Sequence, residues 1–81
     1  MDIVYSIETH NYDLFKKFFH DLNRKEITTH MLATTAAKNG CLEIVKFLHQ
    51  IDQACMTENV PWTAALFGQI HVLTWYVTHR V

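Results

Sequence analysis

Six histidines and two cysteines are the side chains of this 81-residue chain best suited to metal binding or nucleophilic chemistry. The histidines are His10, His20, His30, His49, His71 and His79. Metal-binding helices place histidines three or four residues apart, and structural zinc sites use closely spaced cysteine pairs. No two of these histidines have that spacing, and Cys41 lies far from Cys55. We therefore expect no metal site, with the histidines solvated or capping helices.

Cys41 is the candidate nucleophile, because it follows Gly40 at the expected start of a helix, where the helix dipole lowers the pKa of a thiol. The alternative is that Cys41 is a small residue that fills space. No serine or cysteine has the flanking residues of a known nucleophile motif, and no glycine-rich phosphate loop is present. We expect no enzyme and no cofactor. A catalytic fragment that needs other chains would require a concave pocket with perturbed titratable groups.

Aromatic side chains are the stronger candidates for a functional surface. Trp62, Trp75 and Tyr76 are concentrated near the end of the chain. Tryptophan and tyrosine are enriched at protein-binding hot spots. We expect most aromatic residues to be core, and we predict that Trp62, Trp75 and Tyr76 form a partner-binding patch.

Charge and composition narrow the class of partner. Seven Lys and Arg stand against eight Asp and Glu, for a net charge of −1. The basic residues form no stripe of the kind that nucleic-acid binders carry, so we expect no nucleic-acid partner. No apolar run approaches the roughly 18 residues that span a bilayer, and no signal peptide is recognisable. Two cysteines in an apolar chain are typical of a reducing compartment, either the cytosol or the nucleus, and we predict a cytoplasmic protein.

An internal repeat organises the second half of the chain. The segment 35–48 aligns without gaps with 63–76 at an offset of 28, with Thr-Ala-Ala and Gly identical in both. A weaker first copy aligns at an offset of 30, where His10 replaces the glycine and Ile7 the second alanine. We expect one domain over 1–81 with repeats of approximately 1–27, 28–57 and 58–81.

The residue pattern of each repeat predicts a helix, a tight turn and a second helix. Gly40 and Gly68 suit the position of positive φ that ends a first helix. The alanine pairs at 36–37 and 64–65 suit close packing of first helices. The second helices carry apolar residues on a broad face. These signals predict helices near 2–9, 12–22, 29–39, 42–51, 60–67 and 70–79, with Thr28 or Thr29 capping the third helix and Asn59 the fifth.

One segment conflicts with this scheme, because 70–81 is rich in residues with high strand propensity. The segment aligns with 42–48, which we expect to be helical. This alignment outweighs strand propensity, because propensity alone predicts secondary structure only weakly. We expect a helix there.

The middle repeat, Ala-Ala-Lys-Asn-Gly-Cys-Leu-Glu-Ile-Val-Lys-Phe-Leu over 36–48, resembles the centre of an ankyrin repeat. The resemblance covers about 30–78, and the flanking copies are degenerate. The family's Thr-Pro-Leu-His and Gly-Ala-Asp segments are missing, and the period is shorter than usual. The resemblance therefore implies an all-α helix-turn-helix repeat solenoid of about three ankyrin-like helix pairs, with reduced β-turn fingers. Such short repeats are similar to those of large DNA viruses and protists, which implies the host cytosol for a viral protein.

The resemblance implies a non-catalytic module that binds another protein, either of the cell or of a host. The alternative is a structural protein that self-assembles into a homo-oligomer through an uncapped terminal repeat, since the ends of repeat arrays expose an apolar face.

Overall fold

The computed structural model describes residues 3–21 and 29–79. In these residues it contains helices α1 (Ile3–Glu8), α2 (Tyr12–His20), α3 (Thr29–Asn39), α4 (Leu42–Ile51), α5 (Asn59–Leu66) and α6 (Ile70–His79). A short 3₁₀ helix, η1 (Gln53–Cys55), connects α4 to α5. No strand occurs among the described residues. The expected all-helical class is confirmed, including the helix over 70–79 that strand propensity argued against.

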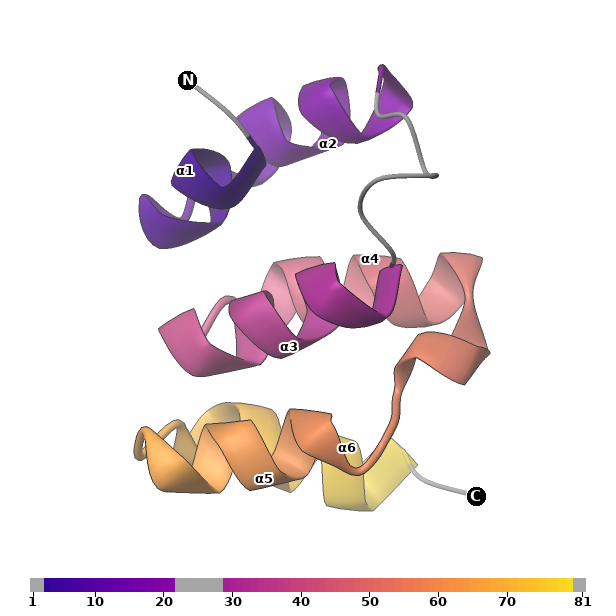
Figure 1. Cartoon of the computed structure of the whole chain (residues 1–81). Helices are drawn as coiled ribbons and strands as arrows, with labels where there is room; N and C mark the ends of the chain where they lie inside the picture. The colour runs from indigo at the N-terminus through magenta and orange to yellow at the C-terminus, as the bar shows by residue number, and fades with distance from the viewer. Residues whose placement is uncertain (1–2, 22–28, 80–81) are drawn as a thin grey trace.

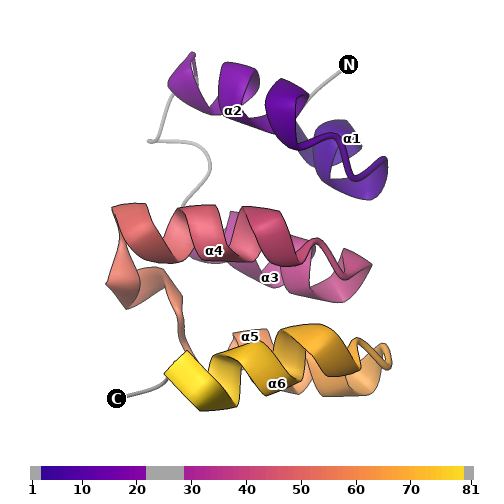
Figure 2. The same ribbon diagram turned by 180° about the vertical axis from the view of Figure 1, so that it is seen from behind.

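The helices form three pairs that follow one another in chain order, α1–α2, α3–α4 and α5–α6 (Figure 1). Helices α3 and α5 lie on one side of the molecule, and α4 and α6 lie on the other, as the view from behind shows (Figure 2). First helices pack on first helices, α1 on α3 and α3 on α5. Second helices pack on second helices, α2 on α4 and α4 on α6.

The same hydrogen-bonded turn ends the first helix of every pair. Gly40 has a φ of +73° and Gly68 one of +72°, while His10 has a φ of +57°. At Gly40, the N–H donates to the carbonyl of Ala37 at 3.2 Å, and the next N–H, from Cys41, donates to Ala36 at 2.9 Å. This is the Schellman arrangement, which supplies donors to the free carbonyls at a helix end. Gly68 and His10 repeat it, with distances of 2.7 to 3.2 Å.

The first two pairs are joined by an aromatic cluster. Phe47 of α4 meets the rings of Tyr12, Phe15 and Phe19 edge-on, with centroid distances of 5.5 to 5.9 Å. Phe15 is fully buried. Rings in this geometry stabilise beyond the area they bury. The crowded aromatics of α2 are therefore core, as expected from their spacing.

Polar contacts join the later pairs. The imidazole of His30 on α3 lies 3.1 Å from the hydroxyl of Thr57 and 3.4 Å from the amide nitrogen of Asn59. Thr29 donates from its hydroxyl to the Asp52 carboxylate at 2.7 Å. These bonds hold the connection between α4 and α5 against the start of α3.

Three local expectations were wrong or fall outside the described residues. The residue before α5 is Glu58, and Asn59 is already helical, with its amide directed to His30 instead of to the helix end. Thr29 likewise lies inside α3 and bonds Asp52, while Thr28 is outside the described residues. In both cases a tertiary contact uses the side chain that was expected to cap a helix, within the second repeat for Thr29 and between the second and third repeats for Asn59.

The alanine pairs differ from each other. Ala36, Ala37 and Ala64 are fully buried, as expected for close helix packing. Ala65 is exposed. Its equivalent, Ala37, lies on a helix against which α5 packs, whereas no described helix follows α6.

Candidate functional site

Two surfaces of the molecule could take part in recognition. The first is a pocket of about 310 Å³ where the turn of the first pair meets the start of α4. Its lining residues are His10, Tyr12, Gly40, Cys41, Leu42, Glu43, Ile44 and His71. The second is an array of exposed apolar side chains on α5, α6 and the turn between them.

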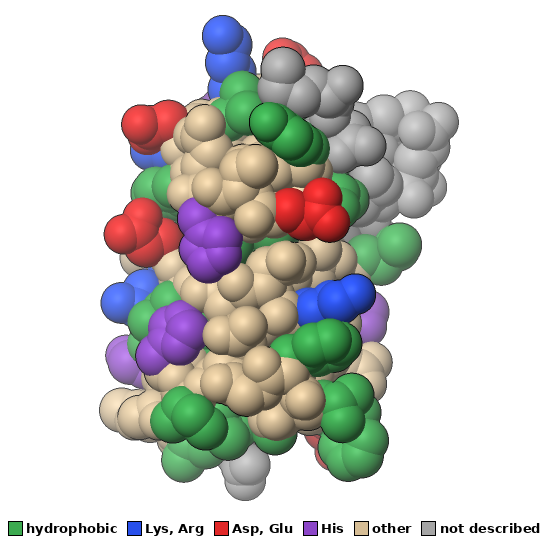
Figure 3. All heavy atoms as spheres, turned by 90° about the vertical axis from the view of Figure 1, so that its left-hand side faces the viewer, with side chains coloured by type: hydrophobic (Ala, Val, Ile, Leu, Met, Phe, Trp, Pro, Cys, Tyr) green, Lys and Arg blue, Asp and Glu red, His purple; other side chains and the backbone are tan. Residues whose placement is uncertain are grey.

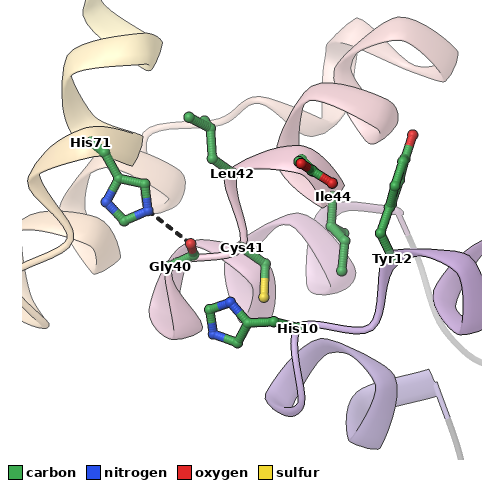
Figure 4. A pocket seen from close by; sticks show the side chains of 8 residues that line it. His10, Tyr12, Gly40, Cys41, Leu42, Ile44 and His71 are labelled. Atoms are coloured by element: carbon green, nitrogen blue, oxygen red, sulfur yellow. Dashed lines mark hydrogen bonds between the residues drawn. The ribbon is translucent and has the colours of Figure 1, made fainter.

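The pocket is built by the repeat turns. His10 and His71 lie on either side of the Gly40–Cys41 turn (Figure 4). His71 donates from Nε2 to the carbonyl of Gly40 at 2.8 Å. His71 is the second residue of α6, and this bond holds the start of α6 against the preceding pair.

The Cys41 thiol at this pocket is not a reactive group. Its sulfur donates to the carbonyl of Ile7 at 2.9 Å. Burial raises the pKa of the Cys41 thiol to about 11, so desolvation outweighs the effect of the α4 dipole. At neutral pH the group is a protonated thiol that links the first two pairs. This agrees with the reading of Cys41 as a small packed residue.

The histidines form no metal centre in the described part of the chain, since no group of three or more histidine, cysteine or acidic side chains is arranged to hold a metal ion there. His49 and His79 contact Trp75 instead, with centroid distances of 5.3 and 4.9 Å. The pocket offers hydrogen-bonding groups and apolar walls.

The apolar surface is concentrated on the last helix pair. Trp62 is 68% exposed, Leu66 67%, Ile70 65% and Val77 63%. Phe67 is 49% exposed, and the Lys38 ammonium lies 5.2 Å from the centre of its ring. Seen from the side on which the repeat turns lie, hydrophobic side chains gather at the end formed by this pair (Figure 3). Large apolar groups left in water at this density mark interaction sites.

The three aromatic residues predicted to form one patch lie on two helices and differ in exposure. Trp62 projects from α5 and is the most exposed large apolar residue described. Trp75 and Tyr76 are on α6 and are only partly exposed, packed against the core. Trp75 fills the space between His49 and His79.

Sequence reasoning missed Leu66, Phe67 and Val77, although the repeat alignment contains the signal. At the offset of 28, Leu66 takes the place of Lys38, Phe67 that of Asn39, and Val77 that of His49. Trp62 replaces Thr34 in the same way. These positions are apolar in the last repeat and polar in the middle repeat. This difference identifies the surface in the sequence.

Comparisons with known proteins add one relative. The chain is 30% identical over 71 residues to a protein of Acanthamoeba polyphaga mimivirus that is named an ankyrin repeat protein. The alignment covers 88% of this chain but only 11% of that relative, so the chain corresponds to a small part of its length. No family model matches the chain, and no solved structure gives a significant match. None of the described helices is long and apolar enough to cross a membrane.

Proposed function

Because this chain is related to the ankyrin repeat proteins, we propose that it is a non-catalytic module that binds another protein. The observation that carries the proposal is Trp62, which is 68% exposed on α5, with the similarly exposed Leu66 one helical turn further on. A large aromatic side chain left in water gains more from burial by a partner than a residue that the fold already covers.

The proposed contact surface is on the side of the molecule where α3 and α5 lie. It consists of Trp62, Leu66 and Phe67, with Lys38 at its edge. The Lys38 ammonium over the Phe67 ring gives this surface a positive charge beside an apolar centre. A polar or charged rim around an apolar centre is typical of protein interfaces. Trp75 and Tyr76 contribute less in this proposal, since much of each side chain is already buried.

The relationship to a mimivirus protein supports a viral origin, and we propose the host cytosol as the compartment and a host protein as the partner. The proposal includes no nucleic acid and no membrane as partners. The chain's net charge of −1 supports the first of these statements.

Affinity capture followed by quantitative binding tests the proposal. The immobilised chain is exposed to a cell lysate, the retained protein is identified and purified, and its dissociation constant is measured by calorimetry. Trp62→Ala should weaken binding by at least about tenfold, the effect of removing an interface hot spot. Ile51→Ala, which shortens an apolar residue that is 44% exposed at the end of α4 and outside this surface, is the matched control and should leave the dissociation constant unchanged. Equal binding by Trp62→Ala and the parent would sink the assignment of this surface.

A second candidate function is a self-assembling structural protein. The open apolar face of the last helix pair favours it, because Ala65, Ile70 and Val77 are all exposed there. The terminal units of repeat arrays need a polar outer face or a covering partner.

A further inference from the structure

The junction between the first and second helix pairs differs from the junction between the second and third at equivalent residues. At the offset of 28, Cys41 corresponds to Gln69 and Glu43 to His71. Gln69 and His71 donate hydrogen bonds to backbone carbonyls at the end of α3, at 3.1 and 2.8 Å. Two polar side chains of the third pair are therefore bound to the turn of the second.

At the earlier junction the equivalent side chains leave a space. Cys41 is short, and its sulfur donates to the carbonyl of Ile7 at 2.9 Å. Glu43 is exposed and has no hydrogen bond or ion pair in the described part of the chain. The pocket of about 310 Å³ lies here, with His10 at one side and His71 at the other (Figure 4). This volume is at the lower end of the range for ligand sites, about 300–1,000 Å³, so it suits a single long side chain.

The charge of the pocket selects the kind of side chain. Apart from the two histidines, Glu43 is the one titratable acid or base with a charge at neutral pH among the lining residues. It lies in the first turn of α4, where its carboxylate offsets the positive end of the helix dipole. An anion would meet this carboxylate with no lysine or arginine in the lining to balance it, whereas a cation would meet its counter-charge. Leu42 and Ile44 supply apolar walls for the methylene groups of a long basic side chain.

The first helix pair shows a carboxylate at the equivalent position that is already paired. Asp13 is the equivalent of Glu43 at the offset of 30. The Lys16 ammonium lies 3.8 Å from the Asp13 carboxylate and 4.5 Å from the centre of the Tyr12 ring. Lys46 has the same spacing from Glu43, but these two described residues form no ion pair. The Asp13 carboxylate is therefore neutralised within the chain, and the Glu43 carboxylate is left for a ligand.

We propose that this pocket receives a basic side chain of a bound protein, with its cationic group at Glu43 and its methylene groups on Leu42 and Ile44. Arginine suits the site best, because its planar guanidinium can donate two parallel hydrogen bonds to one carboxylate. The inference rests on the proposed function, since the side chain belongs to a protein partner. It adds a second contact site, at the turns between paired helices and separate from Trp62.

Titration of the whole chain with N-acetyl-arginine amide, followed by the NMR shifts of the backbone amides, tests the proposal. The amides of residues 40–44 should shift saturably, with a dissociation constant in the millimolar range, as expected for one side chain. N-acetyl-citrulline amide has nearly the same shape but no charge. It should bind at least about threefold more weakly, the effect of losing one partly exposed ion pair.

Glu43→Gln should weaken binding of the arginine probe by a similar factor, because it removes the charge and keeps the shape of the side chain. Glu58→Gln makes the same change at an exposed glutamate outside the pocket and should bind the probe like the parent. Equal affinities for the two probes, an unchanged dissociation constant in Glu43→Gln, or no saturable shift at residues 40–44 would each overturn the proposal. The Trp62→Ala variant should bind the probe like the parent, so failure of this site and failure of the Trp62 surface are separate results.

Discussion

Ala37 and Ala65 are the same residue type at the same place in successive repeats, yet Ala37 is fully buried and Ala65 is exposed. Leu48 and Tyr76 show the same difference, with Leu48 fully buried and Tyr76 partly exposed. The middle pair is covered on both sides and the last pair on one. In this molecule the contribution of a repeat position to stability therefore depends first on whether a neighbouring helix pair covers it. The residue type at that position matters second.

The largest expected difference between the two pairs is at Leu48 and Tyr76. Leu48→Ala should lower the free energy of unfolding by about 2–5 kcal/mol, since it opens a cavity in a fully packed position. Tyr76→Ala should cost less than about 2 kcal/mol, because part of its side chain is already in water. Urea unfolding followed by circular dichroism measures both. Equal losses would show that the last pair is as tightly held as the middle one.

Gly40 and Gly68 give the next comparison, because they share a conformation but not an environment. Valine is strained at this φ, so each Gly→Val variant should lose about 1–3 kcal/mol of stability. Gly40→Val should lose about 1 kcal/mol more, since its side chain would displace Gln69 and His71 and weaken their bonds to the second pair. Nothing lies within 4 Å of the equivalent position at Gly68. Identical melting curves for the two variants would contradict the role of Gln69 and His71 at this junction.

The smallest expected difference is at the alanines. Ala37→Leu should cost about 1–3 kcal/mol because the larger side chain is forced into the packed contact between α3 and α5. Ala65→Leu should change stability by no more than about 0.5 kcal/mol, as is usual at an exposed site. Thermal unfolding of the two variants, followed by circular dichroism, measures this. A large loss for Ala65→Leu would mean that the Ala65 side chain is packed in solution rather than exposed.

The helices of this fold could be predicted because the repeat supplied a register independent of local propensity. The segment 70–79 shows this most clearly, since its residues favour a strand but α6 is a helix like the equivalent α4. The glycines and the paired alanines are informative for a related reason. A turn with positive φ and a close helix contact each admit very few residue types.

The side chains that make tertiary contacts far along the chain could not be predicted in the same way. Asn59 and Thr29 have the chemistry of helix caps, but their partners are His30 and Asp52, more than 20 residues away. The partial burial of Trp75 and the exposure of Trp62 likewise depend on tertiary packing, because Trp75 is on α6, which packs against α4, and Trp62 is on α5. Local reasoning identifies what a side chain can do, whereas the tertiary contact decides which of these options is used.

The two buried cysteines have a consequence for measuring how the molecule opens. Cys41 bonds Ile7 between the first two pairs, and Cys55 is the last residue of η1, with its sulfur 3.7 Å from the carbonyl of Leu48 in α4. Burial raises the pKa of each thiol to about 11, so neither reacts quickly while it is enclosed. The rate at which a thiol reagent labels each cysteine therefore reports how readily a different contact opens. Two unmodified side chains thus allow separate kinetic readouts, one of the first pair separating from the second and one of η1 lifting from α4.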